Sequence, residues 1–217
     1  MIVSAVKNAI PQSLIRRRLP STAGASVLLT FDDGPTRGVT EGVLDRLDAV
    51  GARAIFFLVG RKIADAPELA GEIHRRGHLL GNHSHDHDAR RWPSPFAWRA
   101  DLERCQKLIV DQSGAPCSLY RPPEGKITPM TLFGPRLAGL HHIQWSLDSG
   151  DWSCREADQA RACGRAAAER AADGDIILCH DFHITIHDLL DEMVPRLIDK
   201  GFDLGRGCST LPGGLPG

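Results

Sequence analysis

Short apolar runs alternate with amphipathic segments along most of the chain, and this alternation constrains the fold more than any other feature. The apolar runs have the length of buried strands. They are residues 27–31, 54–59, 78–80, 118–120, 142–145, 176–179 and 202–204. Candidate helices lie between them, at about residues 38–50, 66–76, 94–112, 128–138, 155–172 and 184–199. Strands that alternate with helices predict parallel pairing with crossover connections, and therefore an α/β barrel or a doubly wound sheet.

Composition excludes several classes of protein. With 217 residues, 42% hydrophobic and 24% charged, the chain is expected to form one soluble domain with elaborations. Its 26 Lys and Arg residues against 27 Asp and Glu argue against a nucleic-acid partner. No apolar run approaches the roughly 18 residues that a membrane span requires. No GxGxxG motif follows the first predicted strand, which argues against a dinucleotide-binding fold.

The two ends of the chain are predicted to lie outside the main domain, which spans residues 26–204. Residues 1–25 read as an arm or short helix across that domain, and residues 205–217, rich in glycine and proline, read as a flexible tail. Lys7 and Pro11 interrupt the first apolar stretch, so no secretory signal is recognised and a cytoplasmic location is expected. The six cysteines then read as reduced thiols, with Cys179 a core residue.

Polar side chains follow five of the predicted strands. In parallel α/β folds the carboxyl ends of the strands meet at one rim, where ligands bind. Such residues are Asp32 and Asp33 after the first strand, Asn82, His83, His85 and His87 after 78–80, Arg121 and Glu124 after 118–120, Asp148 and Asp151 after 142–145, and His180 and Asp181 after 176–179. Five such sets of carboxylates, imidazoles and a guanidinium at one rim predict a functional site.

Ten histidines are an unusual number for this chain, and three pairs of them are spaced four residues apart. Gly77 separates His74 from His78, and the pair His183 and His187 reads as a solvated helix face or, as an alternative, as metal ligands. His83 and His87 lie at the rim, where one helical turn would present both rings to one ion. The remaining histidine between them, His85, reads as a surface residue or as a support to the ligands.

A carboxylate from the first strand would complete a metal site with three ligands and an open position, which is typical of catalytic rather than structural zinc. Asp32 and Asp33 are adjacent, so their side chains diverge. One can therefore bind the metal while the other faces the attacking water as a general base. The alternative is an ordinary Asp-Gly-Pro turn.

Five segments that occur in order resemble the motifs of the NodB-type polysaccharide deacetylases, carbohydrate esterase family 4. They are Thr30–Pro35 (TFDDGP), His83–His87 (HSHDH), Arg121–Gly125 (RPPEG), Asp148–Trp152 (DSGDW) and Leu178–His180 (LCH). The resemblance covers about residues 26–204. It implies a distorted or incomplete (β/α) barrel of the NodB-homology type, a divalent metal, and hydrolysis of acetyl groups on sugars.

Carried over by position, the resemblance assigns the reacting groups. It implies that Asp33, His83 and His87 hold the metal. Asp32 would be the general base, and His180 the acid that protonates the departing amine. Arg121 would orient the base, with Asp151 supporting the acid or the arginine and Asp148 contributing nearby.

The resemblance also suggests the substrate-binding residues. Trp152 and Leu178 would wall a small pocket for the acetyl methyl group, beside Pro123 and Glu124. The family often has an aromatic residue where this chain has Glu124, which argues against stacking of a sugar there. The backbone N–H of Glu124 could still help to stabilise an oxyanion.

The sequence therefore predicts a hydrolase that removes acetyl groups, N-acetyl above all, from an oligosaccharide or polysaccharide. Zn²⁺ is the expected cofactor, with Co²⁺, Ni²⁺ or Mn²⁺ as alternatives. Two other functions stay open at this point: an amide hydrolase of the same fold with a non-sugar substrate, and a catalytically silent sugar-binding module. The acid and base together favour an enzyme, because a binding module needs neither.

Overall fold

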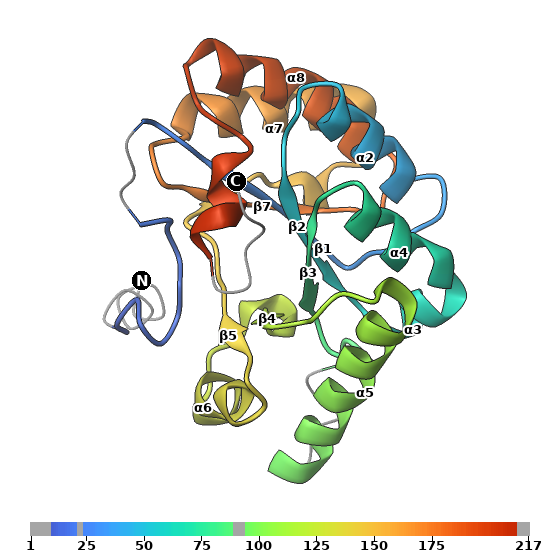
Figure 1. The fold of residues 1–217 in the computed structure, drawn as a ribbon. Coiled ribbons are helices and arrows are strands. Elements are labelled where there is room, and N and C mark those ends of the chain that lie inside the picture. The colour runs from blue at the N-terminus through green and yellow to red at the C-terminus, as the bar shows by residue number, and fades with distance from the viewer. Residues whose placement is uncertain (1–9, 21–23, 89–93, 212–217) are drawn as a thin grey trace.

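The computed structural model describes residues 10–20, 24–88 and 94–211 (Figure 1). Seven parallel strands in this part of the chain form one sheet, in the order β5-β4-β3-β2-β1-β7-β6. The strands are β1 (Leu28–Asp32), β2 (Ala54–Leu58), β3 (Leu79–Asn82), β4 (Leu119–Tyr120), β5 (His141–His142), β6 (Leu147–Asp148) and β7 (Ile176–His180). The predicted parallel α/β architecture is confirmed.

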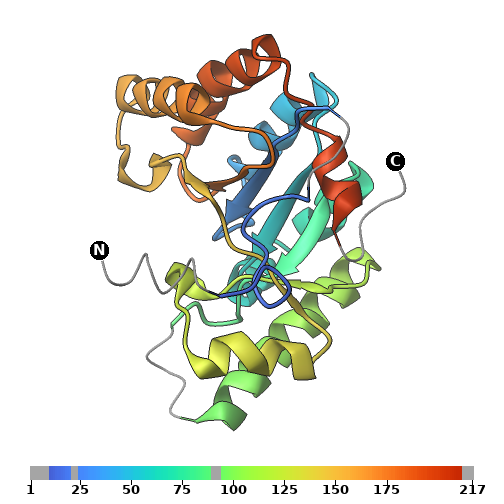
Figure 2. The same ribbon diagram turned by 90° about the vertical axis from the view of Figure 1, so that its left-hand side faces the viewer.

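The helices cover the outside of the sheet, and each except α8, which follows the last strand, lies in a connection between consecutive strands. They are α2 (Thr40–Asp48), α3 (Gly60–Asp65), α4 (Pro67–Arg75), α5 (Pro95–Ser113), α6 (Pro129–Leu137), α7 (Ala157–Arg170) and α8 (Ile186–Asp199). Helix starts follow local chemistry: Pro67 opens α4, and the Ser94 hydroxyl accepts the N–H of Ala97 at the start of α5. The pair α7–α8 lies on one side of the strands and α5–α6 on the other (Figure 2).

The connection between β5 and β6 shows that the sheet curls. These strands lie at opposite edges of the sheet, yet only residues 143–146 separate them in the chain. Five peptide steps span at most about 18 Å, so the two edges must approach each other. The sheet is therefore an incomplete (β/α) barrel, as predicted.

The described part of the N-terminal arm lies in the gap between the two edges. The N–H of Arg16 donates to the carbonyl of His142 at 2.9 Å, and the N–H of Gln144 donates to the carbonyl of Arg16 at 2.7 Å. On the other side of the gap, the N–H of Leu19 donates to the carbonyl of Gly174, just before β7, at 2.8 Å. Residues 16–19 are thus hydrogen-bonded across the gap, and residues 11–15 before them form a turn. Residues 1–9 and 21–23 of the predicted arm lie outside the described residues.

The C-terminal segment corrects two predictions. Residues 205–211 are not a loose tail, because the 3₁₀ helix η4 (Arg206–Thr210) packs Cys208, 2% exposed, and Leu211 into the apolar cluster inside the curl. Residues 202–204 are not a strand either. Only an isolated bridge joins Asp203 to Ser26, because the Asp203 carboxylate accepts the N–H groups of Gly205 and Arg206, both at 2.8 Å, and turns the chain. Residues 212–217 lie outside the described residues.

Side chains along each strand alternate between two apolar clusters, one inside the curl and one under the helices. In β1, Leu28 belongs to the inner cluster, and Leu29 and Phe31 belong to the outer one. By the same alternation Thr30 and Asp32 face the inside of the curl. Polar groups at the end of β1 thus enter the interior at the carboxyl rim. No helix among the described residues is both long and apolar enough to cross a membrane.

Candidate active site

The ends of β1 and β7 bring two predicted site residues side by side. The strands pair in register with Asp32 opposite His180, and neighbouring strands lie about 4.8 Å apart. His180 is two residues beyond Leu178 and four beyond Ile176, so it shares their inward face. Asp33 follows with a φ of 71°, a conformation that Asp tolerates better than most residues. The turn sends its side chain in another direction, as predicted for the adjacent pair.

The loop that carries His83 and His87 is not the helical turn that the spacing suggested. Ser84 and His87 adopt φ values of 68° and 51°, which no right-handed helix contains. The Asn82 side chain accepts the N–H of Ser84 at 2.8 Å, and the Ser84 hydroxyl accepts the N–H of His87 at 3.0 Å. These side-chain hydrogen bonds fold a tight loop that still presents both rings, with centroids 4.9 Å apart.

Asp33, His83 and His87 converge as a three-ligand group whose donor atoms all lie within 4.8 Å of one another. Asp33 Oδ1 lies 2.9 Å from His87 Nε2 and 3.4 Å from His83 Nε2. Burial alone would raise the pKa of Asp33, but the two rings outweigh it and hold that pKa well below its usual range. Asp33 is therefore a carboxylate at neutral pH.

Two further observations fit this group to a divalent cation. Asp33 Oδ1 is buried and, apart from the two imidazole nitrogens, has no polar partner, an arrangement that a cation bound between the three atoms would stabilise. His83 Nδ1 lies 2.8 Å from the carbonyl oxygen of Arg121. Because a carbonyl only accepts, Nδ1 carries a proton, and Nε2 is the ring nitrogen that faces Asp33 and is available to a metal ion. Two imidazole nitrogens and one carboxylate suit zinc and similar metals and leave coordination positions open.

Arg121 holds Asp32 from inside the curl. The guanidinium is fully buried and its Nη1 donates to Asp32 Oδ1 at 2.7 Å. Its other contacts are Thr30 Oγ1 at 2.9 Å, the carbonyls of Gln144 at 3.1 Å and Ile143 at 3.3 Å, and the Phe57 ring at 4.2 Å. A cation with so many acceptors is fixed in place. It leaves the second oxygen of Asp32 3.7 Å from His83 Nε2.

Asp151 holds His180 in the same manner. Its Oδ1 lies 2.9 Å from His180 Nδ1, its Oδ2 accepts the backbone N–H of His180 at 2.6 Å, and the Ser149 hydroxyl donates to Oδ1 at 3.0 Å. Burial would lower the pKa of His180, but Asp151, with smaller effects of Asp32 and Asp33, raises it to about 9. The Asp151 carboxylate thus favours the protonated imidazolium of His180 and orients its ring. Of the two supporting roles predicted for Asp151, the geometry favours that toward His180.

These groups face a cavity of about 440 Å³ at the carboxyl rim. Its lining comprises Asp32, Asp33, His83, His87, Glu124, Gly125, Trp145, Asp148, Trp152, Leu178 and His180. Pro123 is buried in the 3₁₀ helix η2 (Pro123–Gly125) and does not line the cavity. Trp145 and Gly125 were not predicted. A Cβ on Gly125 would lie 2.3 Å from the Trp145 ring, so glycine lets the indole close this side. The search for polar residues after strand ends could not identify Trp145 and Gly125, because neither offers a charged or ligand-binding side chain.

The other histidines for which a role was predicted contact neighbouring groups of the fold instead. His187 Nε2 lies 2.8 Å from the carbonyl of Val39, and its ring fills the space above Gly42 of α2. It is thus packed between α8 and α2 rather than on a solvated face, and His183 Nδ1 contacts Thr185 instead. His85 is buried, 4% exposed, with its Nδ1 2.8 Å from Asp86, so it is not a surface residue.

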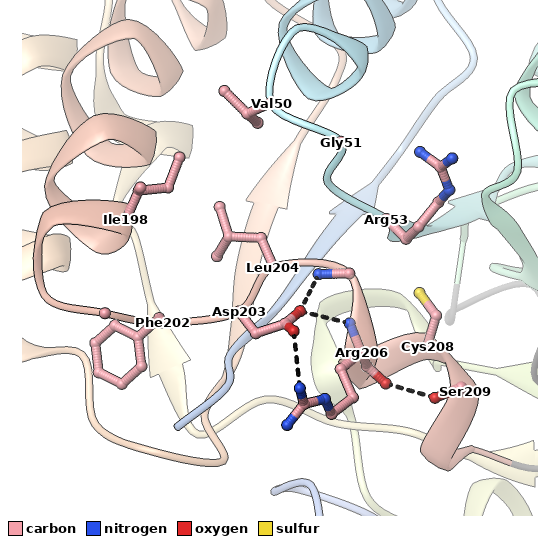
Figure 3. Close-up of a pocket in the computed structure, with 12 residues that line it drawn as sticks. Val50, Gly51, Arg53, Ile198, Phe202, Asp203, Leu204, Arg206, Cys208 and Ser209 are labelled. Atoms are coloured by element: carbon pink, nitrogen blue, oxygen red, sulfur yellow. Dashed lines mark hydrogen bonds and ion pairs between the residues drawn. The ribbon is translucent and has the colours of Figure 1, made fainter. Parts of the chain in front are cut away.

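A larger hollow of about 900 Å³ lies at the opposite end of the sheet, between Val50–Arg53 and Phe202–Ser209 (Figure 3). Its polar groups are already engaged: the Asp203 carboxylate binds the N–H groups that follow it and the Arg206 guanidinium. Burial raises the pKa of Cys208 to about 12, so its thiol is not a nucleophile at neutral pH. The candidate metal ligands, base and acid therefore lie at the carboxyl rim, and this larger hollow contains no comparable group among its described residues.

Comparison with known proteins places the chain in a family. Residues 20–143, more than half of the chain, match the family model for polysaccharide deacetylase. The chain is 33% identical over 204 residues to the peptidoglycan-N-acetylglucosamine deacetylase PgdA of Listeria monocytogenes, covering 89% of this chain but 42% of that protein. It is also 33% identical to the chitooligosaccharide deacetylase of a Bradyrhizobium strain, covering 90% and 95%.

A solved structure shows the same similarity. The family 4 carbohydrate esterase of Streptomyces lividans, solved with acetate, superposes with a TM-score of 0.75 at 30% identity, covering 83% of this chain and 92% of that one. The chain spans less than half the length of the Listeria relative but nearly the whole of the Bradyrhizobium one. The resemblance read from the five motifs is confirmed: the chain belongs to the polysaccharide deacetylase family, carbohydrate esterase family 4.

Proposed function

We propose that this protein is a metal-dependent hydrolase that removes N-acetyl groups from a saccharide. One observation carries the proposal: a carboxylate fixed by Arg121 and an imidazolium fixed by Asp151 border the same cavity as the three-ligand group. A base, an acid and a cation site around one space are what amide hydrolysis requires. The membership of the chain in a family of sugar deacetylases supports the substrate class.

Asp33, His83 and His87 would hold the metal, most simply Zn²⁺, with Co²⁺, Ni²⁺ or Mn²⁺ as substitutes. When bound, the cation would supply Lewis-acid polarisation of the acetyl carbonyl and a lowered pKa for water beside it. The residues around the cavity would then move the protons. Asp32 accepts one proton as the water oxygen bonds to the carbonyl carbon, and Arg121 keeps its carboxylate in place for this step.

His180 acts at the other end of the scissile bond. As an imidazolium it donates the proton from Nε2 to the amide nitrogen while the carbon–nitrogen bond breaks, and Asp151 stabilises its charged form beforehand. The products are acetate and a free amine. Leu178 and the rings of Trp145 and Trp152 would surround the acetyl methyl group and exclude bulk water from it.

Acetate release tests this function directly. The purified protein is incubated with N-acetylated oligosaccharides after chelation, and again after addition of one equivalent of Zn²⁺. We expect release only with the metal, and loss of at least about 100-fold in rate for Asp32→Asn, because general base catalysis contributes 10²–10⁴. Asp191→Asn, a surface carboxylate paired with Arg46, serves as the control. Acetate release that persists in the metal-free protein would refute the proposal.

A further inference from the structure

A second cavity of about 280 Å³ adjoins the first at the proposed metal ligands. It shares Asp33 and His87 with the first cavity, and its other walls are Val59, Arg61, Lys62 and Phe182. Because the two spaces have these ligands in common, a ligand longer than one sugar in the first cavity can extend past them into the second. The second space is therefore positioned to contact a neighbouring part of the substrate.

The two cavities differ in charge. Four carboxylates line the first, namely Asp32, Asp33, Glu124 and Asp148, beside the cationic His180. The second contains two permanent cations, Arg61 and Lys62, and only the shared Asp33 as an anion. A divalent cation on Asp33 would offset that carboxylate, which leaves the second cavity positive. This distribution favours an anionic group on the Arg61–Lys62 side.

Both cations retain capacity for a ligand. Lys62 Nζ donates to the hydroxyl of Thr36 at 3.1 Å, and no described carboxylate lies within ion-pair distance of it. Arg61 donates from Nη2 to the backbone carbonyl of Asp86 at 2.6 Å, and its Nε is 3.9 Å from the Asp86 carboxylate. That carboxylate is closer to His85, at 2.8 Å. Arg61 thus has only a long ion pair with Asp86, and Lys62 interacts with the buried Asp181 at a longer range than an ion pair, so both side chains can still bind an anion in the cavity.

The backbone fixes these cations relative to the metal ligands. The N–H of Val59 donates to the carbonyl of Gly34, next to Asp33, at 2.9 Å. The N–H groups of Gly60 and Arg61 donate to the carbonyls of Ser84 and His85, inside the loop that carries His83 and His87. The segment that carries Arg61 and Lys62 is thus hydrogen-bonded to the loop of Asp33 and to the loop of His83 and His87. Backbone hydrogen bonds therefore fix the distance between the two cations and the proposed metal ligands.

We propose that the second cavity is a subsite for a carboxylate on a sugar unit next to the acetylated one, so that the substrate is an acidic saccharide. Arg61 and Lys62 would bind the carboxylate, since a guanidinium edge and an ammonium both suit it. The Phe182 ring, which meets His180 edge-on with centroids 5.5 Å apart, would contact the apolar face of the sugar. This inference rests on the proposed function and specifies its substrate.

Matched substrates test the subsite. The probes are a tetrasaccharide of alternating N-acetylglucosamine and N-acetylmuramic acid with free carboxylates, and the same compound with those carboxylates converted to N-methylamides. For the zinc-loaded protein we expect kcat/KM to be about tenfold higher for the free acid, the value of one charge-assisted hydrogen bond. In Arg61→Gln/Lys62→Gln the ratio falls toward one, mainly through KM. Arg61→Gln alone, at an exposed position, gives an intermediate ratio if the double variant folds poorly.

Lys107→Gln is the control, because Lys107 is an exposed lysine paired with Asp111 that lines neither cavity; it should keep the wild-type ratio. Equal kcat/KM for the two probes in the wild type, or a wild-type ratio in the double variant, would overturn the subsite while the deacetylase function stands. Release of acetate from neither probe, nor from neutral N-acetylglucosamine oligomers, would instead overturn the proposed function and this inference with it.

Discussion

Replacing Asp151 with Asn tests how the fold prepares His180 as an acid. Asp151 is the main cause that raises the pKa of His180 from 6.5 to about 9, against the lowering effect of burial. At 1.36 kcal/mol per pH unit, this corresponds to roughly 3 kcal/mol in favour of the imidazolium. Asn keeps the shape but removes the charge, and its amide NH₂ would oppose either the backbone N–H or the ring N–H of His180. The pKa of His180 should then fall toward 6.5.

The expected result is a loss of activity that depends on pH. From protonation alone, a fall from 9 to 6.5 reduces the active fraction about 30-fold at pH 8 but less than twofold at pH 6. The assay is the pH profile of acetate release from about pH 4 to pH 9 for both proteins with the same metal, because a bound cation would move both profiles to lower pH. Imidazole titration by NMR in the metal-free proteins measures the His180 pKa directly, and Asp191→Asn should leave both readouts unchanged. A loss by the same factor across the whole profile would refute the reasoning and indicate a structural role.

The pair of His180 and Asp151 should also contribute to the free energy of unfolding, in a way that depends on pH. The folded pKa of His180 lies above its unfolded value, so the contribution of the protonated pair is complete below pH 6.5 and is lost as the pH rises through about 9. The difference in unfolding free energy between wild type and Asp151→Asn should therefore be larger at pH 6 than at pH 9.5, as measured by urea denaturation. A difference that is independent of pH would contradict the linkage.

Three further variants test other parts of the site. His83→Ala should lose stoichiometric zinc binding in calorimetry, because it removes one of three ligands, whereas His183→Ala, outside that group, should bind normally. A zinc-loaded His83→Ala would refute the ligand assignment. Asp32→Asn should keep the metal while its kcat falls at least about 100-fold; wild-type turnover would exclude Asp32 as the base. Gly81→Ala should lower the unfolding free energy by about 1–3 kcal/mol, because a Cβ there would lie 2.3 Å from the Phe57 ring that supports Arg121. Unchanged denaturation would show that Phe57 can move freely.

The sequence predicted those parts of the site that depend on strand ends. The predicted strand 27–31 followed by Asp-Asp-Gly-Pro leaves little choice about where the two carboxylates lie, and parallel pairing then brings His180 beside Asp32. The same logic could not identify Trp145, because the predicted strand 142–145 contains only the last residue of β5, His142, followed by the crossing to β6. Edge strands this short are set by their neighbours, not by an apolar pattern of their own.

Local hydrogen bonding explains the other differences. Residues 83–87 have the spacing of a helical turn, but Asn82 and Ser84 offer their side chains to the backbone and produce a tighter loop. The glycine-rich composition after residue 204 suggested a loose tail, yet the inner cluster needs a cover at that end of the curl, and Cys208 and Leu211 provide it. The composition of a segment cannot predict this packing, because the apolar surface that the segment covers exists only after the sheet has curled.

Arg121 links the fold to the chemistry most directly. A buried guanidinium is costly unless acceptors satisfy it, and here they come from β1, at Thr30 and Asp32, and from the β5–β6 crossing, at Ile143 and Gln144. The curl of the sheet brings those two segments together. The interaction that orients the proposed base is therefore also one that joins the two sides of the open barrel. Its carbonyl in turn sets the tautomer of His83, so a disturbance at this one side chain should reach both the base and the metal ligands.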